Sequence, residues 1–132
     1  MRFTEHELTS AITGVAKAIV AARRKDVRRG RADIDTVWDE LDRFERFQIL
    51  DQLGDQILPV LVALPDVSVA PGTRASYTDR EVSDTVEAVL GDAPGGLRRA
   101  VLVKTRTALV QSALAHIPPR QDPDALIVPD HL

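Results

Sequence analysis

The chain has 132 residues, of which 44% are hydrophobic and 28% are charged, and these values are typical of a single globular domain. It contains no cysteine, which excludes disulfides and thiolate metal sites and favours a cytoplasmic address. No apolar run approaches the roughly 18 residues of a membrane span, and the first residues lack the apolar core of a secretory signal, so we expect neither export nor a membrane partner. Arginine outnumbers lysine 14 to 3, which indicates a GC-rich bacterial genome.

Charge is distributed unevenly along the chain, although the net charge is only −3. Residues 1–31 carry a net +5, residues 32–66 carry a net −7, and residues 97–120 contain five bases and no acid. Basic and acidic segments of one chain can neutralise each other inside the domain or across a dimer. The pattern therefore favours a second copy of the chain, or another protein, over nucleic acid as the partner.

The chain opens with a predicted helix that runs to Arg29. Thr4 and Glu7 have the spacing of a capping box, which satisfies two backbone N–H groups at a helix start. Gly30 follows the last turn, where a left-handed residue commonly ends a helix. An apolar stripe with helical spacing is formed by Leu8, Ala11, Ile12, Val15, Ile19 and Ala22.

The acidic middle of the chain is predicted to be helical but interrupted. Asp35 is placed to cap a short helix, and Asp42 is placed to start a second one. In this second helix Phe44, Phe47 and Leu50 point to one side.

Gly54 is predicted to stop or kink this helix, with Asp55 as a new cap. The following residues are apolar on every face, so we expect residues 56–64 at the centre of the bundle or in an interface. A buried strand is the alternative, which the helical neighbours on both sides disfavour. Together with an apolar stretch at residues 125–128, this run is more than a small bundle easily hides and predicts a homodimer.

Residues 65–77 contain two prolines and a glycine and are predicted to form a long connection. Thr78 and Glu81 then repeat the capping-box spacing at the start of another helix, and Gly91 ends it.

A last long helix is expected from Leu97 to Ile117, where two prolines stop it. We assign residues 1–117 to one helical domain and residues 118–132 to a Pro- and Asp-rich tail that is docked on the domain or binds a partner. The predicted fold class is all-α: an irregular bundle of four main helices plus one or two short helices, one long loop and an extended C-terminal tail.

A basic cluster lies around the end of the first predicted helix. Such a cluster fits a nucleic-acid phosphate backbone, and it equally fits the negative end of the helix dipole beside an acidic neighbour. No aromatic residue lies within it to stack on bases, so we favour the structural interpretation. The six bases are Arg23, Arg24, Lys25, Arg28, Arg29 and Arg31.

A candidate anion site is predicted in the last helix. Arg106 falls in the middle of its apolar face, among Leu102, Val103, Leu109 and Val110, and a buried guanidinium needs an anion. The structural interpretation has two forms. Arg106 pairs with an acid of the middle region, such as Glu45, Asp51 or Asp55, or its side chain reaches solvent. The functional alternative is a carboxylate or phosphate ligand held by Gly95, Gly96, Arg98, Arg99 and Arg106.

The sequence contains no catalytic motif, metal-ligand pattern or cofactor fingerprint. His6, His116 and His131 are far apart in the chain. We therefore expect a non-enzymatic interaction or regulatory module without a cofactor, with a nucleic-acid-binding regulator and a small anion-binding protein as the alternatives.

Overall fold

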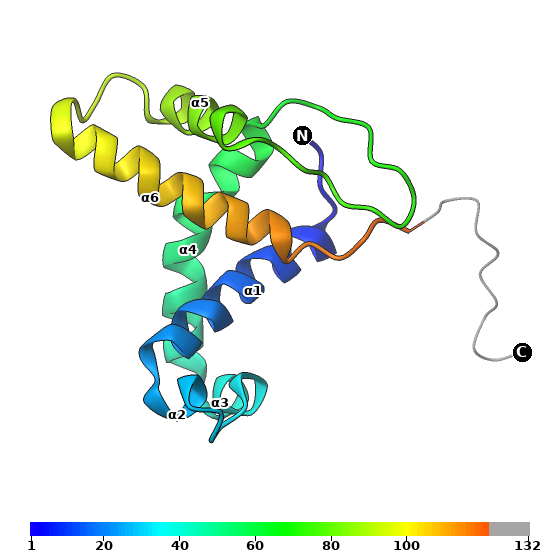
Figure 1. Cartoon of the computed structure of the whole chain (residues 1–132), viewed down its shortest axis with the longest axis vertical. Helices are drawn as coiled ribbons and strands as arrows, with labels where there is room; N and C mark the ends of the chain where they lie inside the picture. The colour runs from blue at the N-terminus through cyan, green and yellow to red at the C-terminus, as the bar shows by residue number, and fades with distance from the viewer. Residues whose placement is uncertain (122–132) are drawn as a thin grey trace, which may run out of the picture.

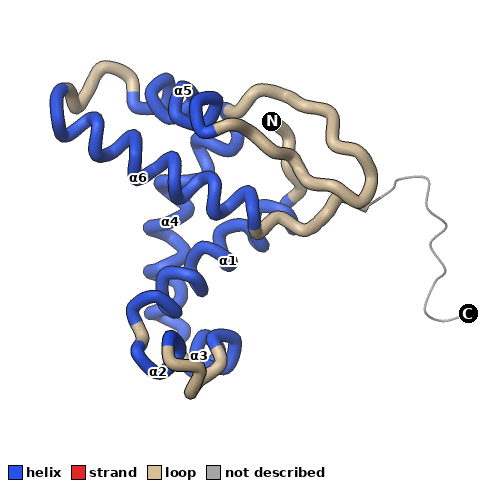
Figure 2. The backbone as a smooth tube through the Cα atoms, in the orientation of Figure 1, coloured by secondary structure: helices blue, strands red, loops and turns tan. Residues whose placement is uncertain are grey.

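The computed structural model describes residues 1–121, and within them every regular element is a helix (Figure 2). The predicted all-α class is confirmed, with four helices of 12 residues or more and two short ones. In chain order the helices are α1 (Glu5–Arg23), α2 (Lys25–Arg28), α3 (Ile34–Glu40), α4 (Arg43–Ala63), α5 (Asp79–Leu90) and α6 (Gly96–Ala115).

The helices are arranged around the long helix α4 (Figure 1). Helices α5 and α6 lie side by side across one end of α4, α1 packs against both α4 and α6, and α2 and α3 sit at the far end of α1. The part of α6 nearest its N-terminus extends beyond the rest of the bundle together with the end of α5. The molecule therefore has a compact centre and two projecting ends.

The C-terminal part of α4 forms the centre of the core, as predicted for residues 56–64. Ile57, Val60 and Leu61 are fully buried, and Leu64 nearly so. The opposite side of the same segment is exposed at Val62, so the bundle covers only one face of this run.

Both predicted capping boxes are confirmed. In α1 the Glu7 N–H donates to Thr4 Oγ1 at 3.1 Å and the Thr4 N–H donates to Glu7 Oε1 at 2.9 Å. Thr78 and Glu81 make the same two bonds at the start of α5. Gly91 ends α5 with a φ of +68°, which is the left-handed region that favours glycine.

The prediction of one helix up to Arg29 is wrong, because α1 ends at Arg23 and a separate turn, α2, follows. Arg24 has an extended backbone between the two helices. The carboxylate of Asp26 accepts the Val27 N–H at 2.9 Å and pairs with the Arg24 guanidinium at 3.0 Å, so local side-chain bonds favour a new helix start there. Gly30 does have the expected positive φ, at the end of α2.

The start of α3 is also shifted from its predicted position. Asp33, rather than Asp35, caps the helix by accepting the Thr36 N–H at 3.3 Å. Asp35 lies in the first turn and pairs with Lys17 of α1 at 2.9 Å. This ion pair links the short helix α3 to α1.

Gly54 does not interrupt α4, and the prediction of a stop there is wrong. The helix continues from Arg43 to Ala63, with Pro59 inside it. Gly54 is buried on the side of α4 that faces α1, where Leu8 and Ile12 lie beside it. Packing against α1 maintains the helix through a residue whose intrinsic preference is unfavourable by about 1 kcal/mol.

A second glycine lies where α1 crosses the end of α6. A Cβ added at Gly14 would lie 2.3 Å from Cγ and 2.5 Å from Cβ of His116. Only a residue without a side chain permits this approach.

The described part of the tail is docked on the helical domain through Arg120. Its backbone N–H donates to Thr73 O at 2.7 Å, and its carbonyl accepts the Gly72 N–H at 2.8 Å. Its guanidinium donates to Glu7 Oε1 at 3.1 Å and to Arg2 O at 3.2 Å. The apolar stretch at residues 125–128, proposed to dock or to bind a partner, lies outside the described residues.

Candidate functional site

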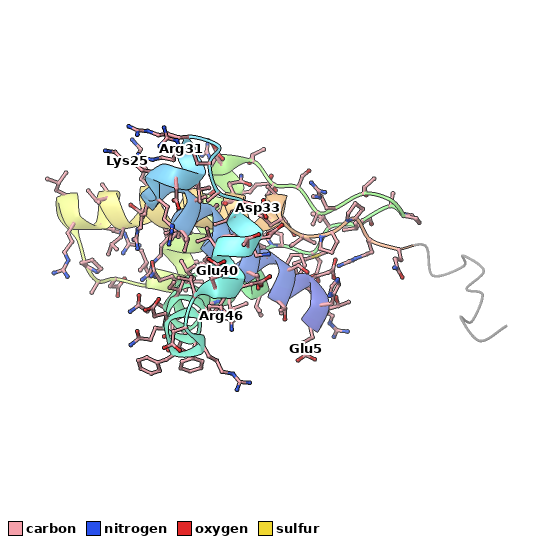
Figure 3. The ribbon with its side chains drawn as sticks, turned by 90° about the horizontal axis from the view of Figure 1, so that it is seen from below. Glu5, Lys25, Arg31, Asp33, Glu40 and Arg46 are labelled. Carbon is pink, nitrogen blue, oxygen red and sulfur yellow. The ribbon has the colours of Figure 1, made fainter. Side chains whose placement is uncertain are left out.

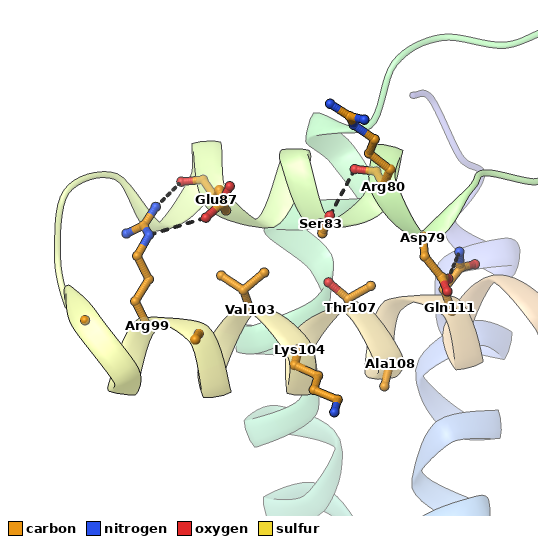
Figure 4. Close-up of a pocket in the computed structure, with 12 residues that line it drawn as sticks. Asp79, Arg80, Ser83, Glu87, Arg99, Val103, Lys104, Thr107, Ala108 and Gln111 are labelled. Atoms are coloured by element: carbon orange, nitrogen blue, oxygen red, sulfur yellow. Dashed lines mark hydrogen bonds and ion pairs between the residues drawn. The ribbon is translucent and has the colours of Figure 1, made fainter.

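Arg99, one of the predicted anion ligands, binds the C-terminal end of α5 (Figure 4). Its guanidinium donates to the carbonyls of Glu87 at 3.1 Å, Gly91 at 2.7 Å and Pro94 at 3.3 Å. It also lies 3.6 Å from Glu87 Oε1. The carbonyls at a helix end lack intrahelical partners and carry the negative end of the dipole, so Arg99 serves as a side-chain cap for α5.

A groove of about 720 Å³ runs between α5 and α6 beside this cap. Of the five predicted anion ligands, Gly96 and Arg99 line the groove, whereas Gly95, Arg98 and Arg106 do not. Because Arg99 is engaged by backbone carbonyls, the groove offers only Arg80 and Lys104 as further cations. The other lining residues are Asp79, Ser83, Glu87, Ala100, Val103, Thr107, Ala108 and Gln111. The structure thus separates the predicted ligands instead of gathering them around one anion.

Arg106 is half-buried on the inner side of α6. Its Nε is buried without a hydrogen-bond partner, and within residues 1–121 it forms no ion pair with Glu45, Asp51 or Asp55. Its terminal nitrogens are not among the buried atoms without partners, and the residue is only partly buried. Of the interpretations weighed for this residue, the structure supports a side chain that extends past its apolar neighbours to the surface.

Arg106→Leu is expected to leave the free energy of unfolding unchanged or to raise it by about 1 kcal/mol, because it removes a buried donor that has no partner. Urea unfolding of the two proteins checks this. Inorganic phosphate or succinate should change neither melting temperature. A loss of about 3–5 kcal/mol would instead reveal a carboxylate left without its partner.

The basic cluster is exposed at one end of the molecule. All six of its bases, Arg23, Arg24, Lys25, Arg28, Arg29 and Arg31, are exposed. Figure 3 shows Lys25 and Arg31 at one edge, with Asp33 next to them and Glu40 further along the α3 segment toward Arg46. Arg24 is engaged by Asp26, so the cluster offers fewer free cations than its sequence suggests.

We expect no salt-sensitive binding of duplex or single-stranded DNA beyond that of any weakly basic patch. Acidic groups adjoin the cluster, and no aromatic side chain lies within it to stack on bases. Fluorescence anisotropy at low and physiological salt checks this, with an Arg28→Glu/Arg29→Glu protein for comparison. A low-micromolar complex that weakens steeply with salt and is lost in the double variant would favour the nucleic-acid alternative.

The surface feature that sequence reasoning missed is an exposed aromatic pair on α4. Phe44 is 63% exposed and Phe47 is 62% exposed, although their spacing correctly predicted that they share a side of the helix. The spacing predicts on which side of the helix the two residues lie, but it does not predict whether another element covers that side. The charged residues around them, Arg43 and Glu45, were the available signal for exposure.

An apolar groove of about 340 Å³ lies between α1 and α4, further along α4 than this pair, and neither phenylalanine lines it. Helix α4 contributes Leu50, Gly54 and Leu58, and α1 contributes Leu8 and Ile12. The rim and remaining lining consist of Glu5, Thr9 and Thr13. Exposed aromatic side chains next to an apolar groove are typical of a protein-interaction surface.

The described residues offer no cluster of three or more His, Cys, Asp or Glu side chains that would hold a metal ion. Among these residues, no helix combines the length and the apolar character needed to cross a membrane. Comparison with protein-family models, with curated proteins and with solved structures gave no match.

Proposed function

We propose that the chain is a non-enzymatic helical interaction module that works as a homodimer. The observation that carries this proposal is the exposed pair Phe44 and Phe47, which helical spacing places on the side of α4 that borders the apolar groove between α1 and α4. Aromatic residues are enriched in protein interfaces and dominate their binding energy, whereas a monomer gains nothing by exposing two of its three phenylalanines.

We place this module in the bacterial cytoplasm. The absence of cysteine and the excess of arginine over lysine support this assignment.

Light scattering coupled to size exclusion tests the proposal. We expect a mass close to twice 14.5 kDa at micromolar concentration, falling toward the monomer mass on dilution. A monomer that persists at high micromolar concentration would show that the chain does not work as a homodimer.

A further inference from the structure

One face of α4 carries both a protruding and a recessed element. Phe44 and Phe47 protrude from its first two turns, and the groove at Gly54 and Leu58 is recessed about two to three turns after Phe47. These four residues are separated by three, seven and four positions, which is the spacing that keeps side chains on one helical seam. The protrusion and the recess therefore face the same direction.

The two elements are arranged symmetrically about the middle of the helix. Phe47 and Gly54 lie on either side of Leu50 and Asp51, about 10 Å apart along the axis at 1.5 Å per residue. Phe44 and Leu58 flank the same midpoint further out. A rotation of 180° about an axis through this midpoint places each protrusion over the recess of a second copy, and such self-complementarity is what a two-fold interface requires.

We propose that α4 packs antiparallel against α4 of a second copy, with Phe47 of each chain seated in the α1–α4 groove of the other. Gly54 provides the space for the ring, because any side chain there would point into the groove. Phe44 covers Leu58 at the groove's outer end. This inference rests on the proposed homodimer and adds the surface and the register through which it forms.

Charge at the two ends of the seam is complementary in this arrangement. Arg43 stands beside the two phenylalanines, and Glu5 stands on the rim of the groove. Both are exposed, and within residues 1–121 neither forms an ion pair. The antiparallel arrangement brings each Arg43 toward Glu5 of the second copy, which supplies the missing partners.

The charge pattern also favours a second copy of the chain over the chain's own tail as the occupant of the groove. The apolar stretch of the chain's own tail, residues 125–128, is followed and preceded by aspartates, and no Lys or Arg occurs after Arg120. It therefore lacks a cation to meet Glu5. The basic cluster does not compete for this face, since Lys25 and Arg31 lie at the edge opposite Glu5 and Arg46 (Figure 3).

Sedimentation equilibrium of the full chain tests the proposal, with the dimer dissociation constant as the readout. Phe47→Ser is expected to weaken the dimer by about 30-fold or more, as for an interface anchor. Leu97→Ser is the matched control: Leu97 is 83% exposed on α6, outside the proposed contact, and its loss should leave the dissociation constant unchanged. Circular dichroism checks that both variants retain the helical fold.

Gly54→Ala gives a second, more specific readout. The added Cβ would lie 3.5 Å from Leu58 Cδ1, an ordinary contact, so the substitution fits the fold. Alanine also favours the helix. We expect the melting temperature of the dilute monomer to rise while the dimer weakens about tenfold, because the methyl group occupies the recess. A merely structural role for Gly54 would not move the two quantities in opposite directions.

A charge exchange tests the register. Arg43→Glu should weaken the dimer by bringing two like charges together, and combining it with Glu5→Arg should restore at least half of the loss. If the chain is a dimer but Phe47→Ser and Gly54→Ala leave its dissociation constant unchanged, the α4 contact is wrong and the homodimer stands. If the chain is monomeric throughout, both the contact and the proposed function fail.

Discussion

Replacing Gly14 with leucine is expected to lower the free energy of unfolding by about 3 kcal/mol. The Cβ alone would approach Cβ and Cγ of His116 to 2.3–2.5 Å. The His116 Cβ is fixed by the backbone at the α6 terminus and does not move when the ring rotates, so α1 and the end of α6 must separate. Chemical denaturation of the dilute monomer provides the measurement.

Two alanine variants separate this steric effect from helix propensity. Gly14→Ala should destabilise by about 1–2 kcal/mol, since the clash exceeds the gain of about 1 kcal/mol from alanine in a helix. Gly54→Ala carries the same gain without a clash and should stabilise the monomer. Equal stabilisation by both alanines would show that α1 and α6 do not approach each other as described.

Breaking the contact between Glu7 and Arg120 is expected to have the second-largest effect. The Glu7 side chain is 9% exposed and that of Arg120 is 31% exposed, and they meet at 3.1 Å. Arg120→Met leaves a buried carboxylate without its cation and should cost about 2–3 kcal/mol, less than for a fully buried pair because Arg120 reaches water. Glu7→Gln keeps the capping geometry, removes the charge, and should cost about 1–2 kcal/mol.

The same contact predicts how stability changes with pH. Burial raises the pKa of Glu7, but the hydrogen bond from the Thr4 N–H and the bond and charge of Arg120 outweigh it and hold the pKa below its ordinary value. A carboxyl whose pKa is lowered by folding stabilises the protein fully above its ordinary pKa, and that stability is lost as the pH falls through the folded-state value. Thermal unfolding should therefore show a steeper acid loss in the wild type than in Glu7→Gln. Parallel curves would mean that Glu7 contributes no charge-dependent stability.

The elements that the sequence predicted well are those governed by local chemistry. The capping boxes at Thr4 and Thr78 and the stop at Gly91 depend on residues within one turn of each other, and all were confirmed. The predicted stop at Gly54 failed because contact with α1 maintains the helix there. Propensity is a local quantity, and such tertiary contacts override it.

In the candidate sites, too, local sequence predicted which residues share a helix face, and tertiary contacts decided what those residues do. Helical spacing singled out the cations Arg99 and Arg106, but the element that faces each of them decides its role. The end of α5 engages Arg99, whereas Arg106 extends to solvent. Likewise, spacing placed Phe44 and Phe47 on one side of α4, but only the arrangement of the helices shows that this side is uncovered.

The bonds of Arg120 have a consequence for the order in which the protein is completed during synthesis. A ribosome adds about 5–20 residues per second, so Glu7 and the loop at Gly72 and Thr73 emerge seconds before the residue that binds them both. Until then the Glu7 carboxylate at the start of α1 has no guanidinium partner, and the loop at Gly72 and Thr73 lacks its backbone hydrogen bonds to Arg120. The first helix to be made is thus among the last to have its contacts completed, and a nascent chain that stalls before residue 120 would expose its loop to proteases.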